Sequence, residues 1–127
     1  MNENDISYIV RGSIFKIYQS LGPGLLESVY VACLAHELTA VGLKVRQQVP
    51  LPVVYQNIKL ELGFRIDLMI NGLVLIEVKS IELLAPVHHK QVITYLKLSG
   101  LKLGILVNFN TDQIEKCIIR KVNGLEN

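Results

Sequence analysis

The feature that most constrains the fold is a set of three charges in otherwise apolar, strand-like sequence around an Asn71-Gly72 pair. Asp67 precedes the pair in a run that alternates between two kinds of side chain, and Glu77-Val78-Lys79 follows it. Asn-Gly between two such runs predicts a β-hairpin. Charge within apolar strands is costly unless it is paired, solvated or bound to a metal. The register of this hairpin therefore decides what the three charges can do together.

Two hairpin registers are compatible with the turn. A two-residue type I′ loop at Asn71-Gly72 would pair Asp67 with Ile76 and turn Glu77 to the opposite face. A three-residue loop, residues 70–72, with its glycine in the left-handed bulge position would place Asp67 opposite Leu75, with Glu77 diagonally beside it. A one-residue slip moves every side chain to the other face, so hydrophobicity can choose between the two registers.

The bulged register is favoured because it alone gives one entirely apolar face. That face would collect Phe64, Ile66, Leu68, Val74, Ile76 and Val78. The other face would collect Arg65, Asp67, Glu77 and Lys79. A plain alternative is a solvated strand face on which opposite charges neutralise one another.

Composition indicates one folded domain over residues 1–127. Half of the 127 residues are hydrophobic and 19% are charged, which argues against extended disorder. A net charge of +2 neither requires nor excludes a nucleic-acid partner. No apolar run is long enough for a membrane span, and the polar, acidic start is unlike a signal peptide, so we expect a cytoplasmic protein. Cys33 and Cys117 lie among apolar neighbours, which favours buried, reduced thiols.

Periodicity and breaker residues predict a mixed α/β fold. Helices are expected over residues 5–20, 25–41 and 86–99, bounded by Gly-Pro-Gly, Gly42, Pro86 and Gly100. Strands are expected over residues 44–55, 59–70, 73–80 and 102–108, the first an edge or irregular strand because it contains two prolines. Residues 114–122 are expected to form a short strand or helix.

Two of the expected helices carry polar side chains toward the inside. In the second, Leu34, Leu38 and Val41 define a buried stripe that Tyr30-Val31 and Glu27 continue toward the N-terminus. A simpler role for Glu27 is complementation of the helix dipole. In the third, spacings of three and four residues place His88, Gln91 and Tyr95 on one face. A polar flank with a half-buried tyrosine is the simpler interpretation there.

These residues carry a resemblance to a known family. Residues 24–30, Gly-Leu-Leu-Glu-Ser-Val-Tyr, match the Gly-x-x-Glu-x-x-Tyr signature, and the likeness extends over nearly the whole chain. It continues through Asp67, Glu77-Val78-Lys79, residues 86–88, Gln91-x-x-x-Tyr95 and residues 104–109. The chain thus resembles the GxxExxY proteins, a branch of the PD-(D/E)xK nuclease-like superfamily. One departure is that Ile66, rather than proline, precedes the aspartate.

The resemblance implies a restriction-endonuclease-like core, with a central mixed sheet flanked by helices in the order α-α-β-β-β-α-β-(β). It implies that Asp67, Glu77, the Val78 carbonyl and Glu27 hold a metal ion, directly or through water. Lys79 would activate or orient the attacking water. Gln91 would position water or substrate, while Tyr30, His88 and Tyr95 would bind substrate or support the site.

Oxygen ligands of this kind suit Mg²⁺ or Mn²⁺ rather than zinc. The expected activity is hydrolysis of phosphodiester bonds in nucleic acid, in DNA more than in RNA. A junction-resolving nuclease, which would need a symmetric homodimer, is a narrower form of this hypothesis. The alternative is a non-catalytic accessory module that binds nucleic acid or protein and retains the nuclease fold.

Overall fold

A computed structural model describes residues 1–126, with Leu62 described by its backbone alone. Helices α1 (Glu3–Leu21) and α2 (Glu27–Ala40) come first, followed by strands β1 (Val45–Tyr55), β2 (Ile58–Ile70) and β3 (Val74–Lys79). Helix α3 (Pro86–Ser99) then leads to β4 (Leu103–Asn108), the short 3-10 helix η1 (Ile114–Lys116) and β5 (Ile118–Val122). This succession confirms the predicted order of elements, and residues 114–122 form both a short helix and a short strand.

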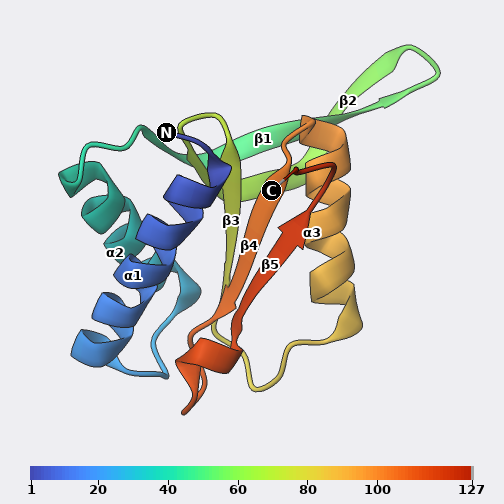
Figure 1. Ribbon diagram of the computed structural model, residues 1–127. Helices are drawn as coiled ribbons and strands as arrows, with labels where there is room; N and C mark the ends of the chain where they lie inside the picture. The colour runs from blue at the N-terminus through green and yellow to red at the C-terminus, as the bar shows by residue number, and fades with distance from the viewer. Residues whose placement is uncertain (127) are drawn as a thin grey trace.

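The five strands form one mixed sheet in the order β1-β2-β3-β4-β5. β3 and β4 are parallel, and the other three neighbouring pairs are antiparallel. Helices α1 and α2 cover one face, and α3 covers the other (Figure 1). The distal part of the β1–β2 hairpin projects beyond this three-layer body (Figure 1). The expected position of β1 at the sheet edge is thereby confirmed.

An apolar cluster fills each face of the sheet. The larger cluster packs α1 and α2 against alternate residues of the central strands, and includes Ile6, Val10, Ile14, Leu34, Leu38, Val74, Ile76, Val78, Ile105 and Val107. The smaller cluster lies under α3 and includes Val49, Leu51, Ile66, Leu75, Val92, Tyr95, Leu96 and Leu106. β3 is buried on both sides, as expected for a strand with a parallel neighbour and helices on both faces.

The β1–β2 hairpin changes from one cluster to the other along its length. Leu68 packs with the α1/α2 cluster, whereas Ile66, two residues earlier on β2, packs with the α3 cluster. Phe64 also packs with the α3 cluster. The prediction that Phe64 and Ile66 share an apolar face with Leu68 is therefore wrong. A regular strand would keep them on one face, so the alternation is broken at Asp67.

Close approach of α3 to the sheet depends on Gly104. A Cβ atom at this position would lie 2.8 Å from Val92 Cγ1 and 3.1 Å from Leu75 Cδ1. These contacts are shorter than normal packing permits, so the missing side chain lets α3 rest directly on β4.

Two smaller expectations need correction. Val41 does not continue the buried stripe of α2, because it caps the C-terminus of the helix and is 59% exposed. Cys33 and Cys117 are free thiols, as expected, but both are half-buried rather than fully buried. Within residues 1–126, no helix combines the length and apolar character needed to span a bilayer.

Candidate functional site

The ladder between β2 and β3 opens where the two predicted acids lie. Its last regular pair is Leu68 with Ile76, so the register places Asp67 opposite Glu77. The expected pairing of Asp67 with Leu75 is therefore wrong by two residues. An even shift would keep both acids on one face of a regular strand, but β2 is irregular at Asp67, so the proximity of the two acids rests on their hydrogen bonds rather than on a shared face.

The position of the hairpin loop explains this shift. Asn71 and Gly72 both have positive φ, at 53° and 65°, and the Leu73 amide donates to the Ile70 carbonyl at 2.9 Å. This is the backbone of a type I′ turn, with Leu73 as the extra residue before β3 begins. The extra residue thus lies after the glycine, whereas the predicted loop had it before the Asn-Gly pair.

Side chains replace the backbone hydrogen bonds where the ladder opens. The Asp67 amide donates to Glu77 Oε1 at 3.0 Å. In return, the Val78 amide donates to Asp67 Oδ2 at 2.9 Å. Each carboxylate is therefore held in place by the backbone of the opposite strand, which keeps the two acids adjacent.

Burial makes this pair of acids electrostatically unfavourable. The Glu77 side chain is only 3% exposed. This burial, and next the charge of Asp67, raise the pKa of Glu77 to about 8. Burial also raises the pKa of Asp67, against the Val78 amide and the Lys79 charge, which lower it. A cation bound beside the buried Glu77 and the half-buried Asp67 would offset this cost.

The positive charge of Lys79 acts on both acids. Lys79 follows Leu75 and Glu77 at two-residue steps on β3, which places all three on the α3 side of the sheet. Its charge lowers the pKa of Asp67 and of Glu77. The structure thus brings Asp67, Glu77 and Lys79 together.

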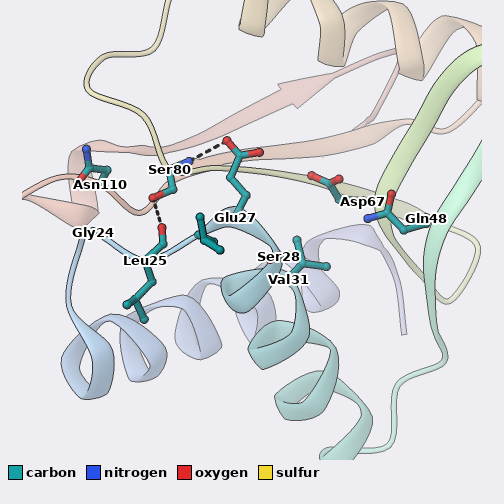
Figure 2. Close-up of a pocket in the computed structure, with 10 residues that line it drawn as sticks. Gly24, Leu25, Glu27, Ser28, Val31, Gln48, Asp67, Ser80 and Asn110 are labelled. Atoms are coloured by element: carbon teal, nitrogen blue, oxygen red, sulfur yellow. Dashed lines mark hydrogen bonds between the residues drawn. The ribbon is translucent and has the colours of Figure 1, made fainter.

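Glu27 enters the same region from the first turn of α2. A cleft of about 630 Å³ is lined by Gly24, Leu25, Leu26, Glu27, Ser28, Val31, Gln48, Asp67, Ser80 and Asn110. Figure 2 shows Glu27 and Asp67 reaching toward this cleft from α2 and β2. Glu27 Oε2 accepts a hydrogen bond from the Ser80 amide at 3.2 Å. Its carboxylate is therefore tied to the end of β3, just beyond Lys79.

Tyr30 anchors the loop that carries Glu27. Its ring is fully buried and stacks on Phe109, with centroids 4.1 Å apart and planes 3° from parallel. Its hydroxyl donates to the Gly22 carbonyl at 2.6 Å and accepts from the Leu25 amide at 3.2 Å. Tyr30 does not line the cleft. Tyr30 therefore supports the loop before α2.

Gln91 and Tyr95 form a pair on the other side of the acids. Gln91 Nε2 donates to the Tyr95 hydroxyl at 2.9 Å. Burial, and next the charge of Glu77, raise the pKa of Tyr95, so its hydroxyl lies within the field of the acidic pair. We infer that the Gln91–Tyr95 pair borders the site from α3.

His88 has a local role at the start of α3. Its Nδ1 atom accepts a hydrogen bond from the Ala85 amide at 2.9 Å, and its own amide donates to the Ala85 carbonyl at 3.0 Å. These reciprocal bonds satisfy groups that the helix leaves unpaired. His88 thus caps the start of α3 through its Nδ1 atom and its backbone amide.

Four polar residues of the cleft were not predicted from the sequence: Ser28, Gln48, Ser80 and Asn110. Ser80 Oγ donates to the Leu25 carbonyl at 2.5 Å and so joins the end of β3 to the loop before α2. Asn110 lines the cleft from the segment after β4, and Gln48 lines it from β1. Ser80 directly follows Lys79, which was a usable signal. Gln48 follows another glutamine in an irregular strand and carried no signal of its own.

The donor atoms suit a hard divalent cation. Within the described residues, no three His, Cys, Asp or Glu side chains cluster closely enough to form a complete metal cage. Mg²⁺ does not need one, because it commonly binds through one or two carboxylates and keeps several waters. Asp67 and Glu77, adjacent and oxygen-bearing, fit that requirement, with Glu27 in the same cleft.

Comparison with known proteins supports this view of the fold. A family model described as the PD-(D/E)XK nuclease superfamily matches residues 4–121. Searches of curated proteins and of solved structures found no significant match. The matched region contains nearly all of α1, every element from α2 to η1 and most of β5, together with all of the predicted site residues.

Proposed function

Because this chain belongs to the PD-(D/E)XK nuclease superfamily, we propose that it is a metal-dependent nuclease that hydrolyses phosphodiester bonds in nucleic acid. DNA is the preferred substrate of this proposal, and Mg²⁺ or Mn²⁺ is its cofactor. Membership establishes a nuclease-type mixed α/β fold, and it makes nucleic acid the expected substrate class. The particular activity rests on the site.

One observation carries the proposal: the opening of the β2–β3 ladder at Asp67 and Glu77. The buried Glu77 and the half-buried Asp67 lie opposite one another, are held by hydrogen bonds of 3.0 and 2.9 Å, and share the field of Lys79. Perturbed carboxylates beside a lysine and a cleft are typical of functional sites. Their oxygens and the lysine suit a cation and a phosphodiester, respectively.

The Val78 backbone supports the proposed ligand set. Its amide points into the gap between β2 and β3, where it donates to Asp67. In an extended strand the carbonyl of a residue points to the same edge as its amide, so the Val78 carbonyl faces this gap as well. Asp67, Glu77 and this carbonyl would hold the ion, and Glu27 would reach it directly or through water.

The bound ion would supply charge neutralisation and lower the pKa of a water ligand. In our proposal, Lys79 stabilises negative charge on the phosphate and orients the attacking water. Gln91, supported by Tyr95, positions water or substrate from α3. His88 and Tyr30 hold the elements that carry these groups, and contact of His88 with substrate remains part of the proposal.

Several finer features belong to the same proposal. They are membership of the GxxExxY branch, a cytoplasmic location, and a symmetric homodimer of the kind a junction-resolving nuclease would need. Light scattering of the purified protein tests the dimer, and a mass of a single 14.2 kDa chain would remove the junction-resolving form of the hypothesis.

The second candidate is an accessory module that binds nucleic acid or protein without cleaving it. It is favoured by the absence, among residues 1–126, of three acidic or histidine side chains close enough to form a metal cage. The hydrogen bond from the Ser80 amide to Glu27 also favours this candidate, because the Glu27 carboxylate would have to move or act through water to reach a metal ion.

Cleavage assays with isosteric variants separate the two candidates. Purified protein is incubated with single-stranded, duplex and branched DNA and with RNA, with Mg²⁺, Mn²⁺ or EDTA. Asp67→Asn keeps an oxygen that can accept from Val78, and Lys79→Met keeps most of the side-chain volume. Glu115→Gln and Lys102→Met serve as exposed controls.

The nuclease proposal predicts metal-dependent cleavage that Asp67→Asn and Lys79→Met abolish and that both controls retain. Equal cleavage by wild type and the two site variants would reject the assigned site. Binding of nucleic acid without cleavage under any condition would instead support the accessory module.

A further inference from the structure

Gln48 adopts a backbone conformation that is unusual for its place in the structure. Its φ angle is 51°, in the left-handed region that non-glycine residues seldom occupy. Within the described residues, the other non-glycine residues with positive φ are Gln56, Asn57 and Asn71, and all three lie in turns. Gln48 alone lies inside a strand, so a tight turn does not explain its conformation.

The unusual conformation lies directly beside Asp67. Gln47 pairs with Leu68 and Val49 pairs with Ile66, which places Gln48 opposite Asp67. That one pair is missing from an otherwise continuous stretch of register. It is also the point at which the hairpin passes from the α1/α2 cluster to the α3 cluster. The backbone therefore departs from regular β-structure at the residue that faces the site.

The Gln48 side chain is directed at the Asp67 carboxylate. Figure 2 shows its amide turned toward Asp67 at the side of the cleft. Its hydrogen-bonding influence lowers the pKa of Asp67, as expected for a donor to the ionised carboxylate. The Val78 amide donates to Asp67 Oδ2 from β3, on one side of β2. Gln48 approaches the same carboxylate from β1, on the other side of β2.

We propose that Gln48 is a positioning residue that orients the Asp67 carboxylate between β1 and β3 for cation binding. Strained backbone persists at functional sites when the surrounding structure holds it there. Here the conformation brings the amide of an edge-strand residue to a half-buried acid of the neighbouring strand. An orienting partner of a metal-binding carboxylate preorganises that ligand and increases its affinity for the ion. The cation part of this inference rests on the proposed nuclease function.

Gln48→Gly tests the proposal, because glycine accepts positive φ while it removes only the side chain. We expect the midpoint of urea unfolding to stay at or above that of wild type. The Mn²⁺ dissociation constant, measured by calorimetry on protein without nucleic acid, should rise by about 10-fold or more. Retained Mn²⁺ affinity in this variant would overturn the proposal.

Gln47 provides a matched control in the same strand. It is an exposed glutamine next to Gln48, but it does not line the cleft. Gln47→Gly should show the reverse pattern, with lower stability from glycine in a regular strand and unchanged Mn²⁺ affinity. Equal losses of Mn²⁺ affinity in both variants would mean that strand flexibility, rather than the Gln48 amide, controls the site.

A measurement without metal separates this inference from the nuclease proposal. The ¹³C chemical shift of the Asp67 carboxyl should change in Gln48→Gly and stay constant in Gln47→Gly. If wild type binds no Mn²⁺ but this shift behaves as expected, the metal-dependent function fails while the contact between Gln48 and Asp67 stands. A shift that does not respond to Gln48→Gly would refute the positioning role.

Discussion

Asp67 and Glu77 face one another across β2 and β3, and each engages the backbone of the other strand through its carboxylate. The arrangement keeps the buried Glu77 beside the half-buried Asp67 where the regular ladder stops at Leu68 and Ile76. Folding alone would favour a neutral pair at this position. Stability therefore favours neutral side chains at these two positions, whereas the proposed activity needs carboxylates that can bind a cation.

The first prediction concerns the pH dependence of stability in EDTA. The pKa of Glu77 is about 8 in the folded protein, against 4.5 without the protein environment. The contribution of protonated Glu77 to the free energy of unfolding is therefore fully present below pH 4.5, and it is lost as the pH rises through about 8. Glu77→Gln removes this loss, so the variant should be more stable than wild type at high pH by at least about 1 kcal/mol.

Urea unfolding across this pH range provides the measurement. Glu115→Gln, at an exposed position, should follow the wild-type curve. Addition of Mg²⁺ should stabilise wild type more than Glu77→Gln, because only wild type keeps the carboxylate. Identical pH profiles for wild type and Glu77→Gln would contradict the prediction.

The second prediction concerns the support of Glu27. Tyr30→Phe keeps the stack on Phe109 but removes the hydroxyl that bonds Gly22 and Leu25. Loss of these bonds should lower the free energy of unfolding by about 1–3 kcal/mol. Cleavage should fall as well, because the loop that leads to Glu27 loses its anchor. Tyr8→Phe, at a site that is 81% exposed, should change neither stability nor cleavage.

The third prediction concerns the packing of α3. Gly104→Ala would place a methyl group 2.8 Å from Val92 Cγ1, and we expect a loss of about 1–3 kcal/mol in unfolding free energy. Val92→Ala should relieve part of that loss, which a double-mutant cycle measures. Gly12→Ala in α1 meets nothing within 4 Å and should instead stabilise the protein by about 0.5–1 kcal/mol. A fully additive cycle would show that the clash is absent.

The fourth prediction tests His88 as a helix cap. His88→Ala removes the acceptor for the Ala85 amide and should cost about 0.5–2 kcal/mol of stability. His88→Glu should recover much of this loss, because a glutamate at the third helical position can accept from the capping residue. Thermal unfolding of both variants is the test. Equal losses in the two variants would show that His88 stabilises the protein by another route.

Most of the fold could be predicted from the sequence because local signals agreed with tertiary packing. Pro86 and Gly100 bound α3 at the predicted positions, since proline suits the first helical turn and Gly100 adopts the left-handed conformation at the helix end. The neighbouring positions of Asp67 and Glu77 were also predictable, because the Asn-Gly turn pairs the two strands that carry them.

Local patterns could not reveal the partners of individual side chains. The roles of Tyr30 and His88 in the structure arise from backbone groups that the fold brings to them, namely Gly22, Leu25 and Ala85. Residues of the same type at the same helical spacing would look identical in sequence with or without these contacts.

The Asp67–Lys79 hairpin contains both predictable and unpredictable features. By itself the sequence determined that two acids and a lysine lie on one hairpin, because the Asn-Gly pair between two apolar runs predicts that the strands carrying them are neighbours. Only the tertiary structure decided that Asp67 lies opposite Glu77, because an extra residue on either side of the Asn-Gly pair preserves the same pattern of faces. It also decided the place of Gln48, because its left-handed backbone arises where the hairpin passes between two cores made by distant helices.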